Sequence, residues 1–259
     1  MSQSSSPAGK LQIVSTPIGN LQDVTLRALA ALRTADVVAA EDTRVTRILL
    51  AAHGISARLL SFHEHNCRRR TGQILQLLAE GRTVALVSDA GTPTLSDPGL
   101  PLVRAAIAAG AAIEIIPGPS AILHALAGSG ASLDRFTYLG FPPRTPGARA
   151  RWLAAAAARG ETCVFFESAH RITRTLAALA EVAPQRYLCV ARELTKRFEE
   201  WTRGPAAAVA EELARRPPRG EYTLVLGASG DSLPGSAGAG TAPPGEVGGG
   251  PVRGAGGCQ

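Results

Sequence analysis

The sequence predicts an α/β protein whose N-terminal half is a parallel, doubly wound sheet. Short apolar runs alternate with stretches in which apolar residues recur at helical spacing. A polar loop follows each of the first four apolar runs. Hydrophobic residues make up 45% of the 259 residues, which is enough for a sizeable core. Because open α/β sheets bind their ligands at the carboxyl edge of the strands, these loops predict a site at that edge.

The longest of the polar loops follows the apolar run at 83–87. Residues 88–99 contain two Ser-Asp pairs, two glycines and two prolines, and a helical pattern starts near Pro98. A crossover turn needs fewer such residues. We therefore interpret this loop as part of a ligand site.

The other elements of the first half follow the same alternation. Strands are expected at 11–15, 36–40, 59–62, 83–87 and 112–116, and helices at 25–32, 41–52, 68–79 and 100–109. Asp23 or Thr25 can cap the first helix, and Gly54, Gly81 and Gly110 stand where the later helices should end. Strands alternating with helices in this way are typical of a parallel sheet.

A rigid turn, Pro117-Gly118-Pro119-Ser120, is the best candidate for a domain boundary. Beyond it we expect helices at 121–127, 149–158, 168–182 and 205–215, strands at 136–139, 162–166, 186–191 and 221–226, and a charged loop at 192–203. The prediction is an N-terminal α/β domain at 11–117 and an α/β C-terminal domain at 118–227.

The two ends of the chain have little to bury. Residues 1–10 are polar and residues 228–259 are rich in Gly, Pro, Ala and Ser, so we expect both segments to be disordered. The chain has no run of eighteen apolar residues and no apolar segment near its start, which predicts neither a membrane span nor a signal peptide. The four cysteines have no CxxC spacing, as is typical of a reduced, cytoplasmic protein.

The net charge of +6 favours a polyanionic partner. Residues 228–259 contain only Asp231, Glu246 and Arg253 as charged groups and sum to −1, which leaves +7 for the rest of the chain. Two basic stretches contain an aromatic residue and could bind a phosphate backbone and a stacked base. One holds Arg144, Arg149, Arg151 and Trp152, and the other holds Arg192, Lys196, Arg197, Arg203 and Trp201. A third, at 68–70, is more simply the solvated start of a helix.

Several common site types do not fit the motifs. Pro17 and Gly19 stand where a dinucleotide site would have G-x-G-x-x-G, and neither lysine lies in a glycine-rich loop. Gly91 stands where an aspartyl-phosphate phosphatase would have a second carboxylate after Asp89. His63 and His65 could hold a metal but lack a third ligand at suitable spacing, so a polar loop lining a cleft is the favoured interpretation.

Eight motifs together resemble the ribosomal RNA small subunit methyltransferase I family. They are residues 15–21 (STPIGNL), 41–44 (EDTR), 63–66 (HEHN), 88–99, 140–142 (GFP), 166–171 (FESAHR), 192–196 (RELTK) and 220–221 (GE). The resemblance runs in order from about residue 11 to residue 227. It implies a class III, tetrapyrrole-methylase-like methyltransferase with two α/β domains.

The resemblance also implies a reaction and its partners. S-adenosylmethionine would bind between the two domains of the chain, without a metal, and the protein would be a homodimer. The methyl group would go to the 2′-hydroxyl of a cytidine in the decoding region of 16S rRNA. The residues expected to hold the donor are Pro17, Gly19, Ser88, Asp89, Ala90, Gly91, Thr92, Pro117, Gly118, Ser120, Gly140 and Phe141. The residues expected to contact RNA are Arg44, Arg144, Arg149, Arg151, Arg171 and Lys196. Candidates for a general base are His63, His65, Glu41 and Glu167.

Two alternatives stay open at this point. A related methylase acting on a tetrapyrrole would share the fold and the donor, although the basic stretches and the motif at 41–44 argue against it. A non-catalytic RNA-binding protein would keep the arginines but would not need the loop at 88–99.

Overall fold

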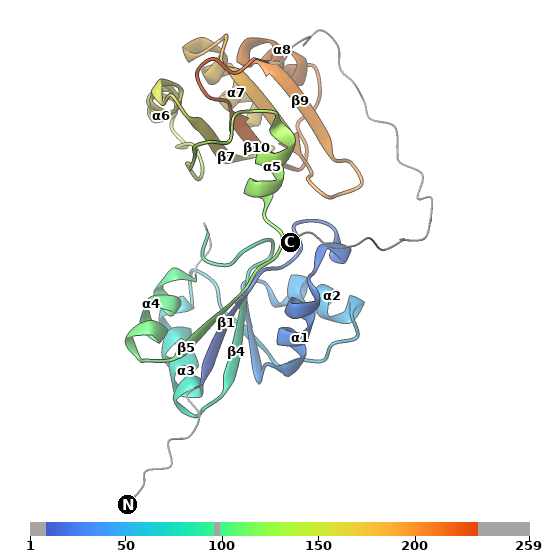
Figure 1. Ribbon diagram of the computed structural model, residues 1–259, viewed down its shortest axis with the longest axis vertical. Helices are drawn as coiled ribbons and strands as arrows, with labels where there is room; N and C mark the ends of the chain where they lie inside the picture. Colours follow the sequence, from blue (N-terminus) through green and yellow to red (C-terminus); the bar gives the residue numbers. More distant parts are fainter. Residues whose placement is uncertain (1–8, 96–98, 233–259) are drawn as a thin grey trace, which may run out of the picture.

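The structure, a computed structural model, describes residues 9–95 and 99–232 and consists of two α/β lobes (Figure 1). The N-terminal lobe ends with strand β5 (Ala112–Ile116), and the C-terminal lobe begins with helix α5 (Ala121–Ser129). The predicted disorder at residues 1–8 and 233–259, and loop residues 96–98, lie outside the described part of the chain. The short connection 117–120 joins the lobes.

The N-terminal sheet is parallel throughout, as predicted. Its strands are β1 (Lys10–Val14), β2 (Val37–Ala40), β3 (Leu59–Ser61), β4 (Thr83–Val87) and β5, in the order β3-β2-β4-β1-β5. All four residues of β2 and the last four of β4 are buried. Such strands are apolar without alternation because both of their faces are covered.

Two helices cover each face of this sheet. Helices α1 (Leu26–Thr34) and α2 (Thr43–Ala52) pack on one face, and α3 (Cys67–Ala79) and α4 (Leu100–Ala108) pack on the other. Thr25 caps α1 by accepting a hydrogen bond of 3.1 Å from the Ala28 N–H. A 3₁₀ turn (Leu21–Asp23) precedes α1.

The order of the strands creates a switch point between β1 and β4, which are neighbours in the sheet. The chain leaves β1 for a helix on one face and leaves β4 for a helix on the opposite face. Doubly wound sheets bind their ligands at the carboxyl ends of the strands beside such a switch point, which is where the loops after β1 and β4 lie.

The C-terminal sheet is mixed. It contains β6 (Phe136–Tyr138), β7 (Thr162–Ser168), β8 (Tyr187–Arg192), β9 (Glu200–Pro205) and β10 (Glu221–Leu226), in the order β6-β7-β10-β8-β9. Only β6 and β7 pair in parallel. Helices α6 (Pro146–Ala158), α7 (Ile172–Val182) and α8 (Ala206–Ala214) pack on one face, and α5 packs on the other.

The structure differs from the sequence prediction in the charged stretch at 192–203. Its second half is not a loop but strand β9, which pairs antiparallel with β8 from Arg192↔Glu200 to Tyr187↔Pro205. An edge strand with one unpaired side tolerates charged residues, so β9 lacks the apolar run by which the other strands were found. Strand β7 also runs to Ser168, and α7 starts only at Ile172.

The first residues of the predicted tail contact the C-terminal lobe. The Ser229 N–H donates to the Gly160 carbonyl over 3.0 Å, and the Asp231 carboxylate accepts from the Ser132 N–H over 3.0 Å. Within the part of the chain that the structure describes, no helix is long and apolar enough to cross a membrane.

Candidate functional site

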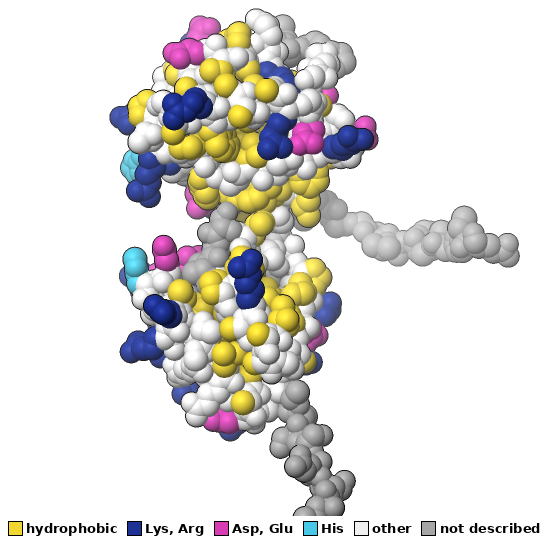
Figure 2. Space-filling model, turned by 90° about the vertical axis from the view of Figure 1, so that its left-hand side faces the viewer, with side chains coloured by type: hydrophobic (Ala, Val, Ile, Leu, Met, Phe, Trp, Pro, Cys, Tyr) yellow, Lys and Arg dark blue, Asp and Glu magenta, His cyan; other side chains and the backbone are white. Residues whose placement is uncertain are grey.

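A cavity of about 340 Å³ lies between the two domains. The N-terminal domain lines it with Ile18 from the loop after β1 and with residues 90–92 and Leu95 from the loop after β4. The C-terminal domain contributes residues 120–122, Phe141, residues 166–168 and residues 221–223. Figure 2 shows hydrophobic side chains gathered on the side of the C-terminal lobe that faces the N-terminal lobe.

The N-terminal wall depends on hydrogen bonds between the loops after β1 and β4. The Thr16 N–H donates to the Gly91 carbonyl (2.9 Å), and the Gly91 N–H donates to the Thr16 carbonyl (3.1 Å). The Ser15 and Thr92 hydroxyl oxygens are 2.9 Å apart. Gly91 has φ +79°, which glycine adopts without steric cost. The two motifs singled out in the sequence therefore form one wall.

The interdomain connection packs closely against the same wall. A Cβ atom on Gly118 would lie 2.9 Å from the Ser15 Cβ, so only glycine fits there. Two residues later Ser120 begins α5, and its hydroxyl accepts from the Leu123 N–H over 3.5 Å. The domain boundary thus helps to build the site.

Aromatic side chains form much of the facing wall. The Phe141 and Phe166 ring centroids are 5.6 Å apart, and the Tyr138 ring lies 5.4 Å from Phe166. Gly140, with φ +70°, accepts from the Phe166 N–H over 2.9 Å and so fixes the turn that carries Phe141. Phe141 remains 52% exposed.

A second contact between the domains lies beside the cavity. The Asn20 N–H donates to the Thr195 hydroxyl over 3.1 Å, and a Cβ on Gly19 would lie 2.5 Å from the Lys196 Cγ. The Lys196 ammonium binds Glu193 (2.9 Å) and Glu221 (2.7 Å). Partial burial lowers the pKa of Lys196, but these two carboxylates outweigh it and raise the pKa overall.

Five of the residues expected to hold the donor line the cavity, namely Ala90, Gly91, Thr92, Ser120 and Phe141. Pro17, Ser88 and Asp89 instead lie around a smaller hollow against α2. The Asp89 carboxylate accepts from the Asp42 N–H over 2.9 Å, so it joins the motif at 41–44 to the loop after β4. Sequence reasoning missed Ile18, Leu95, Ile122 and Phe166, because apolar residues of a cavity have the same sequence pattern as core residues. It also missed residues 221–223, because they belong to a strand that the pattern assigns to the core of the sheet.

The structure gives Glu167 a setting unlike the one that a general base requires. Its side chain is 0% exposed. The carboxylate accepts from the Thr175 hydroxyl (2.6 Å) and the Ser168 N–H (2.8 Å), and it lies 2.9 Å from the Arg171 Nε. The Arg171 guanidinium also donates to the Pro142 carbonyl. These contacts join the end of β7 to α7 and to the turn that carries Phe141.

The other three base candidates lie on the N-terminal domain, away from the lining of the cavity. His63 and His65 follow β3, the edge strand, and their ring centroids are 5.9 Å apart. Glu41 follows β2 and borders a small space beneath the loop after β4. Among the described residues no group of three His, Cys, Asp or Glu side chains could hold a metal ion.

The predicted RNA contacts fall into two groups. Arg144 and Arg151 are exposed, and so is Arg44, although its guanidinium binds Asp42 over 2.6 Å. Arg149, in contrast, is buried and donates to the Arg144 carbonyl over 3.3 Å. Arg171 and Lys196 are held by carboxylates of their own domain.

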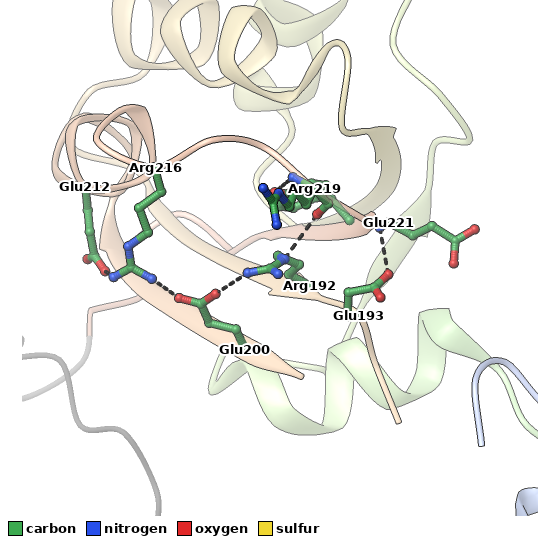
Figure 3. Close-up of polar contacts among 8 residues, drawn as sticks. Arg192, Glu193, Glu200, Glu212, Arg216, Arg219 and Glu221 are labelled. Atoms are coloured by element: carbon green, nitrogen blue, oxygen red, sulfur yellow. Dashed lines mark hydrogen bonds and ion pairs between the residues drawn. The ribbon is translucent and has the colours of Figure 1, made fainter. Parts of the chain in front are cut away.

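The basic stretch at 192–203 is also largely engaged within the domain. Figure 3 shows the Glu200 carboxylate between Arg192, which it binds over 2.7 Å, and Arg216. Trp201 stacks against His124 (6.0 Å between ring centroids), and the Arg203 guanidinium lies 4.8 Å from the centre of its ring. Both contacts are made within the domain.

Comparison with known proteins agrees with this architecture. The sequence profile of the family described as Tetrapyrrole (Corrin/Porphyrin) Methylases matches residues 10–210. Ribosomal RNA small subunit methyltransferase I of Thermotoga maritima is 45% identical over 218 residues, which are 84% of this chain and 98% of that protein.

Solved structures show the same fold at lower identity. A cobalt precorrin-4 methyltransferase superposes with a TM-score of 0.66 at 22% identity, over 84% of this chain and 94% of that one. The uroporphyrin-III C-methyltransferase of Thermus thermophilus, complexed with S-adenosylhomocysteine, has a TM-score of 0.59 at 19% identity, over 85% and 97% of the chains. The chain therefore belongs to the tetrapyrrole methylase family and, within it, to the ribosomal RNA small subunit methyltransferase I group.

Proposed function

We propose that this protein transfers a methyl group from S-adenosylmethionine to the 2′-hydroxyl of a cytidine in the decoding region of 16S rRNA. The observation that carries the proposal is the cavity between the domains, at the carboxyl ends of β1 and β4, in a chain of this group. Doubly wound sheets bind their ligands at such a switch point.

The residues of the cavity fit the methyl donor. Its volume of about 340 Å³ lies within the usual range of small-molecule pockets. Ile18, Ile122 and Phe141 offer apolar surface for an adenine ring, and the hydroxyls of Ser120 and Thr223 offer polar contacts. Glu221 also lines the cavity, and its carboxylate is paired with the Lys196 ammonium over 2.7 Å.

The backbone of Gly91 has a different task in this proposal from the one expected. Its N–H and carbonyl are both engaged with Thr16, so Gly91 shapes the wall and leaves ligand contacts to Thr92 and the neighbouring side chains. Asp89 acts on the donor indirectly, since its carboxylate holds the Asp42 N–H.

The reaction is an in-line displacement, for which holding the two reactants in position supplies much of the rate. When bound, the donor supplies the activated methyl group. Both domains line the cavity, so the chain can hold the donor from two sides and exclude water around it. His63, His65 and Glu41 remain the candidates for accepting the hydroxyl proton, and Glu167 serves to position Arg171 and the turn at Phe141.

The RNA would lie along both domains. Arg44, Arg144 and Arg151 are the exposed arginines proposed for phosphate contacts. On the face shown in Figure 2, Lys and Arg side chains are scattered over both lobes and form no single patch. This arrangement suits a large, shaped substrate such as the small ribosomal subunit.

We further propose a homodimer that works in the cytoplasm and needs no metal. Sedimentation at micromolar concentration should give twice the chain mass of 26.7 kDa, and a chelator should leave the methylation rate unchanged. A monomer in sedimentation would contradict the homodimer. Inhibition by the chelator that a divalent cation reverses would contradict the absence of a metal.

The deciding experiment is to map ribose methylation in 16S rRNA from a strain that lacks this protein. One cytidine of the decoding region should lose its 2′-O-methyl group and regain it when the wild-type gene is restored. A parallel assay offers the purified protein a porphyrinoid acid. Unchanged rRNA together with a methylated tetrapyrrole would replace the proposal, and absence of donor binding in calorimetry would favour a non-catalytic RNA-binding protein.

A further inference from the structure

The loop between β8 and β9 presents an aromatic side chain to solvent. Phe198 is 65% exposed, more than Phe141 (52%) or Phe136 (44%). The Arg197 guanidinium carbon lies 5.5 Å from the centre of the Phe198 ring. Within the described part of the chain, no carboxylate pairs with Arg197. An exposed cation beside an exposed ring is therefore available to a ligand.

Arg197 differs in this respect from the other basic residues of the same stretch. Arg192 is bound to Glu200, and Lys196 is bound to Glu193 and Glu221. Arg203 donates to the Gly128 carbonyl over 3.2 Å and covers Trp201. Of this stretch, Arg197 and Phe198 are the pair left facing outward.

The backbone beneath this pair is held in an unusual shape. Glu193 (φ 52°) and Thr195 (φ 64°) both adopt the left-handed region, which non-glycine residues occupy only when their surroundings impose it. Side-chain hydrogen bonds hold this backbone: the Glu199 carboxylate accepts from the Thr195 N–H (2.5 Å) and the Trp201 ring N–H (2.8 Å), and the Glu193 carboxylate accepts from the Glu221 N–H (3.1 Å). The backbone that carries Arg197 and Phe198 is therefore held in place, which lowers the entropy cost of binding.

The same loop adjoins the interdomain cavity. Thr195 accepts from the Asn20 N–H, and Lys196 binds Glu221, which lines the cavity. In Figure 1 the loop that precedes β9 reaches from the C-terminal lobe toward the N-terminal lobe. A polynucleotide whose target ribose reaches the cavity would pass close to this loop.

We propose that Arg197 and Phe198 bind a nucleotide that flanks the methylated residue. The Phe198 ring stacks on the base, which every base permits, and Arg197 contacts the adjoining phosphate. This inference rests on the proposed function, because it takes rRNA as the substrate. The pair acts in substrate binding and takes no part in holding the donor.

The test measures methyl transfer to small subunits from the deletion strain, with Phe198→Ala, Phe198→Leu, Phe198→Tyr and Arg197→Ala. Loss of stacking should raise KM about 5- to 150-fold in Phe198→Ala and in Phe198→Leu, with kcat nearly unchanged, whereas Phe198→Tyr keeps wild-type KM. Arg197→Ala should lower the slope of log affinity against log salt by about 0.7. Donor affinity in calorimetry should not change in any variant.

Two matched controls separate this effect from a general loss of surface or charge. Phe136→Ala removes an exposed ring from the opposite edge strand of the same sheet. Arg33→Ala removes an exposed charge from the last turn of α1, which lies toward the amino ends of the N-terminal strands. Both controls should keep the KM and the salt slope of the wild type.

The possible outcomes are distinguishable. If the wild-type protein does not methylate small subunits, the proposed function fails. If it does, and Phe198→Ala keeps the wild-type KM or Phe198→Leu restores it, the stacking contact is overturned. A raised KM that accompanies dissociation of a dimer in sedimentation would also overturn the proposal, because Phe198 would then contact a second copy of the chain.

Discussion

In the N-terminal domain five parallel strands lie between two pairs of helices, whereas in the C-terminal domain only one pair of strands is parallel and three helices crowd one face. The described ion pairs of the N-terminal domain lie on its surface, whereas the C-terminal domain has both surface pairs and an enclosed one. Asp42 and Arg44 pair on the surface of the first domain, with the arginine side chain 84% exposed. Glu167 and Arg171 pair inside the second, with the glutamate side chain 0% exposed.

This difference shows why counting basic residues overestimates an RNA-binding surface. Several arginines of the C-terminal domain donate hydrogen bonds to backbone carbonyls or to carboxylates of the same domain. Arg186, for example, donates to the carbonyls of Gly227 (2.6 Å), Ala157 (2.8 Å) and Arg159 (2.9 Å). Part of the positive charge of the chain therefore serves to stabilise the fold. Only the arginines and lysines that remain exposed can attract a polyanion.

The largest expected effect of breaking one of these pairs is at Glu167. Glu167→Gln leaves the guanidinium of Arg171 with a neutral partner in an enclosed setting. We expect the free energy of unfolding to fall by about 3 kcal/mol in urea denaturation. The double substitution Glu167→Gln with Arg171→Met should recover most of that loss, because an apolar replacement leaves no unpaired charge.

An exposed pair of the same spacing provides the control. Glu211 and Arg215 are also four residues apart, and both are 72% exposed. Glu211→Gln should change stability by less than about 0.5 kcal/mol. Wild-type stability of Glu167→Gln together with a large loss of kcat would show instead that the Glu167 carboxylate acts as a base.

The contrast between the domains also explains how much of the fold could be predicted. The strands at 83–87, 112–116 and 221–226 are found by their apolar pattern, and the structure begins and ends them at the predicted residues. Strand β9 (EWTRGP) could not be found in this way, because it is a charged edge strand without an apolar run. Charge along an edge strand and charge along a loop look the same in a sequence.

The site was predictable where backbone turns define it and unpredictable where side chains from distant segments meet. Gly91 and Gly118 are visible in the sequence because their positions require glycine. The engagement of Asp89 with Asp42, 47 residues away in the chain, has no local signal. The enclosure of Arg149 likewise depends on how α6 packs on the sheet, which spacing alone does not show.

The next largest effect is expected at the wall that the two N-terminal loops share. A Cβ on Gly91 would lie 3.5 Å from Ile18 in the cavity lining, and the positive φ disfavours a branched side chain. Gly91→Val should therefore weaken donor binding at least about tenfold in calorimetry, which corresponds to 1.4 kcal/mol. Gly110→Val is the matched control, since Gly110 has φ +72° with open space around it. Equal donor affinities in the two variants would exclude Gly91 from the site.

A smaller effect should distinguish exposed from enclosed arginines within α6 and the turn before it. Arg144→Ala and Arg151→Ala each remove one exposed charge, so each should reduce the salt slope of rRNA binding by about 0.7 and leave the urea midpoint unchanged. Arg149→Ala should instead lower the urea midpoint and leave the salt slope unchanged, because Arg149 is buried. A changed salt slope with unchanged stability in Arg149→Ala would place this side chain in the RNA interface.

The smallest effect concerns the exposed pair on the N-terminal domain. Hydrogen bonds from the Arg44 side chain, and then from its backbone N–H, lower the pKa of Asp42 from 3.8 to about 2. A carboxyl group with a lowered pKa in the folded state stabilises the fold above its unfolded pKa, and this contribution disappears as the pH falls from about 4 toward 2. NMR titration should place the midpoint for Asp42 near 2 in the wild type and closer to 3.8 in Arg44→Ala. Since both groups face solvent, Arg44→Ala should hardly change stability at neutral pH, in contrast to Glu167→Gln. Equal losses in the two variants would contradict the distinction between the surface pair of the first domain and the enclosed pair of the second.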